Sequence, residues 1–248
     1  MTGADPFSAP GRPELIAIEG IDRAGKTTQT ELLRRALEAA GHAVEMLSFP
    51  RYDAFFGRTI RGLLDGLGPT SAATVDPRSM ALWYALDRFD AFRERQAPGS
   101  VRPPPAGVVL VNRFTLSNAV YQSARVEDAD PAEADAVFDW VLELEHGHLG
   151  LPRPALTVVL DVDIELSHER SHRVADAGGR AEEPDLYERS KVLLARARQR
   201  YLDAAHKVAD LVVIPAQVAD QTPGSRSAAH IHADVMTAVT ARLPWLGA

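Results

Sequence analysis

The chain has 248 residues and a formal net charge of -7 at pH 7, which suits one large α/β domain with a sizeable core. The acidic balance argues against sequence-independent binding to nucleic acid, and the absence of cysteine excludes a disulfide framework and a thiolate metal site. No apolar run is long enough for a transmembrane helix, so we expect a soluble cytoplasmic protein.

Short apolar segments alternate with amphipathic segments along the chain. Residues 1–13, rich in Gly, Pro and Ala, are expected to form a flexible arm. The predicted buried strands cover residues 15–18, 43–49, 108–111, 156–160 and 211–214. The predicted helices cover residues 27–40, 76–96, 132–145, 164–175, 185–209 and 228–243. This alternation predicts an α/β fold over residues 14–248, with about five parallel strands, helices on both faces, and ligands at the carboxyl ends of the strands.

The first predicted strand is followed directly by a phosphate-binding P-loop pattern. It consists of Gly20, Ile21, Asp22, Arg23, Ala24, Gly25, Lys26 and Thr27. The glycines let backbone N–H groups surround phosphate oxygens, and Lys26 is expected to reach the β and γ phosphates of ATP. Thr27 is expected to offer its hydroxyl to Mg²⁺, and Thr28 to complete the ATP contacts. A glycine-rich turn that merely joins a strand to a helix is the alternative.

Three further motifs follow the P-loop in a definite order. Phe49-Pro50-Arg51-Tyr52 comes after the second predicted strand, LWYALDR occupies residues 82–88, and NRFTLSNAVYQ occupies residues 112–122. Together with the P-loop, these motifs resemble the thymidylate kinase family over about residues 15–214. The resemblance implies a P-loop kinase fold and transfer of the γ-phosphoryl group from ATP to dTMP, in the synthesis of dTTP. It also implies Mg²⁺ and, usually, a homodimer.

The resemblance places the phosphate and sugar of dTMP among four side chains. Arg51 and Arg113 are expected to contact the acceptor phosphate, for which the guanidinium fork is well suited. Asp22 is expected to meet the 3′-hydroxyl, and Tyr121 to crowd the 2′ position and so disfavour a ribonucleotide. For Arg51 the alternative is a solvated side chain beside a proline, and for Asp22 a solvated loop carboxylate.

The resemblance also implies a binding site for thymine. Tyr84 is expected to stack on the base while Arg88, four residues further on and therefore on the same helical face, reaches a carbonyl oxygen. Phe49 offers a second aromatic face, and Ser117 and Asn118 are expected to read the edge of the base. The alternatives are that the aromatic side chains belong to the core and that Ser117 and Asn118 only begin a helix.

Catalysis of phosphoryl transfer depends on cations around the transferring group. Lys26, Arg23 and Arg113 are the first candidates, with Asp22 helping to place the acceptor. Residues 176–184 contain paired glycines and are expected to form a mobile lid that carries Arg180 as a further catalytic candidate. The adenine contacts are expected from residues 215–217 and from Arg170 or Arg173.

The chain departs from the family pattern at Asn112. Asn112-Arg113-Phe114 stands where the family usually has Asp-Arg-Tyr, so a neutral amide replaces a carboxylate that would help to hold Mg²⁺ or its waters. Other carboxylates available nearby are Asp161, Asp163, Asp185 and Glu188, whose alternative roles are capping and solvation. Two other functions therefore stay open: a related nucleotide or deoxynucleoside kinase with a different acceptor, and a nucleotide-binding module without catalysis.

Overall fold

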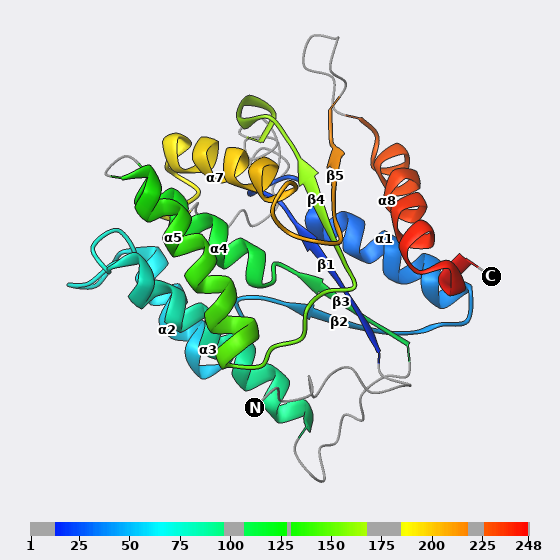
Figure 1. The fold of residues 1–248 in the computed structure, drawn as a ribbon, viewed down its shortest axis with the longest axis horizontal. Helices are drawn as coiled ribbons and strands as arrows, with labels where there is room; N and C mark the ends of the chain where they lie inside the picture. Colours follow the sequence, from blue (N-terminus) through cyan, green and yellow to red (C-terminus); the bar gives the residue numbers. More distant parts are fainter. Residues whose placement is uncertain (1–12, 97–106, 128–129, 168–184, 218–225, 248) are drawn as a thin grey trace.

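The computed structural model describes residues 13–96, 107–127, 130–167, 185–217 and 226–247 (Figure 1). Its centre is a five-stranded parallel sheet with the order β2-β3-β1-β4-β5. The strands are β1 (Glu14–Glu19), β2 (Ala43–Ser48), β3 (Gly107–Asn112), β4 (Leu156–Asp161) and β5 (Leu211–Pro215). All five predicted strands are confirmed, and their ends differ from the predicted ends by at most one residue.

Helices cover both faces of this sheet. Figure 1 shows α1 and α8 on one face, and α3, α4, α5 and α7 on the other, with α2 beside α3. Their bounds are α1 (Lys26–Ala39), α2 (Phe55–Asp65), α3 (Pro77–Gln96), α4 (Thr115–Ala124), α5 (Pro131–Leu142), α7 (Lys191–Ala204) and α8 (Ala228–Arg242). The arrangement is that of a P-loop kinase, as the sequence predicts.

Two helices, α2 and α4, were not predicted from the sequence. Helix α2 contains Gly57, which disfavours a helix prediction, but a Cβ there would lie 1.8 Å from the carbonyl oxygen of Arg51. Helix α4 is buried along its whole length and therefore lacks the polar face by which a surface helix is recognised. The periodic pattern of charged and apolar residues, on which the prediction depends, is absent from such a helix.

Other helix boundaries also differ from the prediction. The predicted helix over 185–209 is in fact α7, which begins at Lys191, where the Ser190 hydroxyl accepts a hydrogen bond from the Leu193 N–H (3.2 Å). The predicted helix over 132–145 is α5 followed by a π-helical turn, η1 (Glu143–His148). A short 3-10 turn, η2 (Pro244–Gly247), follows α8. Of the predicted helix 164–175, residues 164–167 are helical and the rest lies outside the described residues, as do the predicted lid and residues 1–12.

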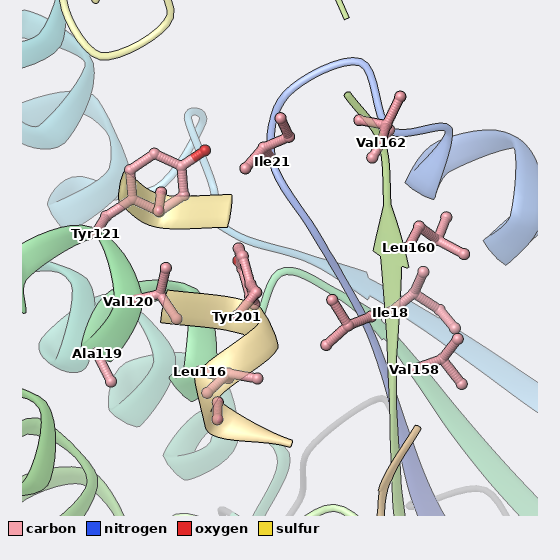
Figure 2. Close-up of a cluster of buried hydrophobic side chains, with 14 of the residues drawn as sticks. Ile18, Ile21, Leu116, Ala119, Val120, Tyr121, Val158, Leu160, Val162 and Tyr201 are labelled. Carbon is pink, nitrogen blue, oxygen red and sulfur yellow. The ribbon is translucent and has the colours of Figure 1, made fainter. Parts of the chain in front are cut away.

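The core fixes the segment that follows β3. Figure 2 shows Leu116 of α4 and Tyr201 of α7 opposite Ile18 of β1, within one buried cluster. Because α4 begins three residues after β3 ends, this packing also fixes the short connection between them. That connection contains Arg113.

The register of the sheet brings the strand ends together. Ile18 pairs with Asn112, and Asn112 pairs with Ser48, so β1, β3 and β2 end at the same edge. The P-loop, Arg113 and Phe49 each follow one of these ends. Among the helices of the described residues, none has the length and apolar character required to span a membrane.

Candidate active site

The P-loop between β1 and α1 has a backbone that depends on its glycines. Gly20 has a φ of 133°, and a Cβ at this position would lie 2.6 Å from the carbonyl oxygen of Leu160 in β4. Arg23 and Gly25 also have positive φ, 58° and 99°. The side chain of Lys26 folds back across the loop, and its Nζ donates a hydrogen bond to the Ile21 carbonyl (2.7 Å). Burial, together with the nearby Arg113, lowers the pKa of Lys26 to about 7.

A cleft of about 630 Å³ extends from this loop toward the beginning of α8. The P-loop residues from Asp22 to Thr28 line it, as do Gln29, Asn112, Arg113, Glu188, Arg226, Ala228 and Ile231. Gly20 and Ile21, which the sequence also predicts as ATP contacts, are buried and do not line the cleft. We call this cleft the donor cleft.

Of the residues predicted to contact adenine, those that the structure describes are held by contacts outside the lining of the donor cleft. Residues 215–217 do not line the donor cleft, and the Gln217 side chain donates instead to Asp163 (3.2 Å). Arg226 lines the cleft and donates to the Pro215 carbonyl (2.9 Å). Arg226 thus links residue 215 to the cleft, and the adenine contact of residues 215–217 stays a prediction, while Arg170 and Arg173 lie outside the described residues.

A second pocket, of about 320 Å³, opens on the other side of the P-loop, and we call it the acceptor pocket. The predicted residues that line it are Asp22, Phe49, Tyr84, Arg88, Arg113, Ser117, Asn118 and Tyr121. Five residues line both this pocket and the donor cleft: Asp22, Arg23, Asn112, Arg113 and Glu188. The two cavities therefore meet at a junction that is rich in charge.

Asp22 and Arg113 form the centre of this junction. Arg113 has a φ of 62° and its N–H donates to the Ile18 carbonyl (3.1 Å), which anchors it to β1. Its guanidinium forms an ion pair with Asp22, and the Tyr121 hydroxyl donates to the same carboxylate (2.9 Å). Burial would raise the pKa of Asp22, but the charges of Arg113 and Lys26 hold it below its ordinary value.

Arg51 is placed differently from the expectation. It does not line the acceptor pocket. Its guanidinium contacts three carboxylates of α3, those of Asp87 (3.2 Å), Asp90 (3.1 Å) and Glu94 (3.1 Å). The structure therefore does not bring Arg51 together with Arg113, and the position beside it, Tyr52, lines the pocket instead.

The predicted base-reading residues are held by buried carboxylates. Ser117 lines the pocket, but its hydroxyl donates to Glu19, the residue before the P-loop, and lies 3.0 Å from the Tyr201 hydroxyl. Glu19 also accepts from the Phe114 N–H (2.8 Å), so it ties the end of β1 to the beginning of α4. Ser117 therefore has a structural role, but not the capping role of the alternative, because α4 begins at Thr115 and has no side-chain cap.

A family model described as thymidylate kinase matches residues 18–221. The chain belongs to the thymidylate kinase family. It is 40% identical over 193 residues to the thymidylate kinase of Mycobacterium tuberculosis, covering 77% of this chain and 85% of that protein. It is 30% identical over 154 residues to human thymidylate kinase, covering 62% of this chain and 63% of that protein.

Solved thymidylate kinases share the fold. The structure from Candida albicans superposes with a TM-score of 0.68 at 18% identity, covering 93% of this chain and 92% of that chain. The structure from Ehrlichia chaffeensis gives a TM-score of 0.57 at 21% identity, covering 92% of this chain and 99% of that chain. At these identities the likeness supports the fold, whereas the sequence relatives show the family.

Asn112, the departure from the family pattern, lies beside Thr27, the predicted ligand of Mg²⁺. Its Nδ2 is 3.5 Å from the Thr27 hydroxyl, and its Oδ1 is buried without a hydrogen-bond partner within the described structure. The described residues contain no group of three or more His, Cys, Asp or Glu arranged to hold a metal. Mg²⁺ prefers oxygen ligands and keeps several waters, so the Thr27 hydroxyl and the unpaired amide oxygen fit it when substrate phosphates supply further ligands.

Several residues of the acceptor pocket were not included in the predicted site. Among them are Tyr52 and Tyr187, together with Asp185 and Glu188, which the sequence analysis names only as nearby carboxylates. Tyr187 stacks on Tyr121 with ring centroids 5.9 Å apart, and burial with the carboxylates of Asp22 and Asp185 raises the pKa of Glu188 to about 7. Their signals were present in the sequence, because Tyr52 belongs to the motif at 49–52 and the other three follow the predicted lid. Arg180 lies outside the described residues.

Proposed function

We propose that this protein transfers the γ-phosphoryl group of ATP to dTMP, giving ADP and dTDP for dTTP synthesis. The observation that carries the proposal is the meeting of two cavities at Asp22, Arg113 and Glu188. A phosphoryl transfer enzyme needs its two substrates in line across such a junction. The P-loop edge of the donor cleft suits the triphosphate, and the aromatic acceptor pocket suits a base.

In this proposal each charged residue has a separate role. Lys26 neutralises the β and γ phosphates, with Arg23 beside it. Arg180, in the predicted lid, is a further candidate and lies outside the described residues. Arg113 orients the acceptor phosphate, one of whose oxygens forms the new bond to the γ phosphorus while the bond to the β–γ bridging oxygen breaks. Mg²⁺ offsets phosphate charge when bound, and Thr27 and Asn112 would hold it or its waters.

The acceptor pocket supports dTMP through its walls. Tyr84 and Phe49 supply aromatic faces for the base, and Tyr121 is fixed by Asp22 beside the expected position of the sugar. Arg88 and Asn118 offer polar groups for the base edge. A single kinase domain over residues 14–248 that forms a cytoplasmic homodimer is part of the same proposal, drawn from the resemblance.

A coupled ADP-release assay with ATP and Mg²⁺ tests the proposal. It compares dTMP, dUMP, UMP, CMP, thymidine and no acceptor at one protein concentration. We expect strong preference for dTMP and a loss of rate greater than about tenfold in Lys26→Ala. Turnover of another acceptor would reassign the pocket. Binding of ATP without any turnover would favour the non-catalytic alternative.

A further inference from the structure

Glu145 is a buried carboxylate that lies just behind the acceptor pocket. It is located on the π-helical turn η1, is fully buried, and is not one of the residues that line the pocket. Its carboxylate nevertheless accepts hydrogen bonds from two side chains that do line it, Arg88 and Asn118. π-helical turns are rare and often mark functional sites. The question is what this carboxylate does for its two partners.

The first consequence concerns the orientation of the Asn118 amide. Its Nδ2 donates to the Ala81 carbonyl (3.0 Å) and to Glu145 Oε1 (2.8 Å), and both partners can only accept. Rotating the amide by 180° would place Oδ1 against two acceptor oxygens, so the hydrogen-bond network fixes the orientation. Oδ1 is left without a hydrogen-bond partner in the part of the chain that the structure describes. A buried acceptor without a donor is costly unless a ligand supplies one.

The second consequence concerns Arg88. Its Nη2 donates to Glu145 Oε1 (2.6 Å) and its Nε donates to Oε2, which gives a two-point ion pair in which both side chains are almost completely buried. Nη1 takes no part in this pair. The guanidinium carbon lies 5.9 Å from the ring centroid of Phe49, another residue of the pocket wall. Glu145 therefore holds the guanidinium in one position beside the pocket.

We propose that Glu145 is a positioning residue that sets which pyrimidine the acceptor pocket takes. Through it the pocket presents one fixed acceptor, Asn118 Oδ1, and one fixed donor, the free edge of Arg88. This pattern matches a base with an N3–H and a 4-carbonyl. A 4-amino pyrimidine presents an unprotonated N3 and an N–H at position 4, so it mismatches both groups. The inference rests on the proposed function, because it concerns the base of the acceptor.

The effect of Glu145→Gln follows from this arrangement. The amide has one acceptor oxygen in place of two, so in either orientation its NH2 group faces a donor of Arg88. Arg88 loses its counter-ion, and when the NH2 group takes the place of Oε1, Asn118 also loses one of the two acceptors that fix its orientation. We expect the ratio of the affinities for dTMP and dCMP to fall about tenfold or more, since sites built to pair a polar group discriminate strongly. The affinity for ATP should stay within about twofold.

The test measures binding and turnover separately. The affinities of wild type and Glu145→Gln for dTMP and dCMP are determined by titration calorimetry, and the turnover of both nucleotides is determined with ATP. Glu143→Gln is the matched control, because Glu143 is on the same π-helical turn but exposed. If Glu145→Gln does not fold, Glu145→Asp keeps a counter-ion for Arg88 with a shorter reach, and a smaller loss of discrimination is expected.

The outcomes distinguish positioning from a merely structural role. A selective fall of the dTMP to dCMP ratio, with unchanged ATP affinity and an unaffected Glu143→Gln control, supports the proposal. Equal weakening of both nucleotides, or an unchanged ratio in a folded variant, overturns it. Wild-type protein that binds dTMP without phosphorylating it would contradict the proposed function, and the binding ratio would still decide the role of Glu145.

Discussion

Lys26 gives rise to a prediction about proton uptake. In the protein without nucleotide, its Nζ is buried and donates to the Ile21 carbonyl, and burial together with Arg113 lowers its pKa from 10.5 to about 7. The β and γ phosphates of ATP would surround Nζ with negative charge and raise this pKa again. Binding of ATP above pH 7 should therefore be accompanied by protonation of Lys26.

The magnitude follows from the pKa. At pH 8, one unit above it, about nine-tenths of Lys26 is neutral, so ATP binding should take up about 0.9 proton. Each further pH unit then weakens ATP binding about tenfold, or by about 1.4 kcal/mol, until the pKa of the bound state is reached. Glu188, whose pKa is about 7, is mostly ionised at pH 8 and can also take up a proton when the phosphates bind, so its contribution has to be measured separately.

Titration calorimetry measures this uptake directly. A non-hydrolysable ATP analogue with Mg²⁺ is bound at pH 8 in buffers that differ in ionisation enthalpy, and the slope of the observed enthalpy gives the number of protons. Lys26→Met is the control: it reports the uptake by other groups such as Glu188, and the difference from wild type gives the uptake by Lys26. An uptake below about 0.2 proton in wild type, with tight binding, would refute the reasoning because Lys26 would already be charged.

The same pKa fixes the sign of a stability effect. Because the folded pKa of Lys26 lies below its unfolded value, the unfolded chain binds more protons between about pH 7 and pH 10.5. The free-energy cost of burying the charged Lys26 is therefore present in full below pH 7, and it decreases as the pH rises. Lys26→Met should raise the melting temperature at pH 7, with a gain that shrinks toward pH 10.

Two further predictions concern Arg51 and Asn112. Because Arg51 is bound to three carboxylates of α3, Arg51→Ala should lower the melting temperature by several degrees and change the KM for dTMP less than about threefold. A tenfold rise in KM without loss of stability would instead support contact with the acceptor phosphate. Asn112→Asp places a carboxylate beside the Thr27 hydroxyl, so the Mg²⁺ concentration for half-maximal rate should fall about threefold or more in a metal titration. An unchanged value would place Asn112 away from the metal.

The three central strands of the sheet, β3, β1 and β4, were predictable because they are buried on both faces, whereas the edge strands β2 and β5 are only partly buried. Parallel strands read as short continuous apolar runs, and the strand Val108 to Val111 is an example in which every residue is buried. Burial also explains why α4 was not predicted. Its residues are buried on all sides, so it lacks the polar face of a surface helix, and they do not form the continuous apolar run of a buried strand. The pattern of apolar and polar residues therefore identifies a strand or helix most readily when its burial is typical of that kind of element.

The P-loop half of the site was predictable because its function depends on consecutive residues. The choice between Arg51 and Tyr52 was not, because the chain turns at these residues, where the Ala54 N–H donates to the Arg51 carbonyl (2.8 Å), and a turn has no simple alternation of side chains. Only the position of α3, with its carboxylates, decides which of the two faces the pocket. Glu145 was even harder to predict from the sequence, because it lies 57 residues from Arg88 and 27 residues from Asn118. No local signal connects these three positions.

The electrostatics of the junction fit a site that awaits anionic ligands. Lys26 has a lowered pKa because it is buried near another cation, and Glu188 has a raised pKa because it is buried near two carboxylates. Both pKa shifts show that, in the protein without nucleotide, the charged form of each side chain is destabilised. A bound triphosphate would stabilise the charged lysine, and an acceptor phosphate held by Arg113 would replace part of the role of Asp22 as its counter-ion. Arg113 is therefore charged and in place before substrates bind, whereas the charge of Lys26 is completed only when the phosphates arrive.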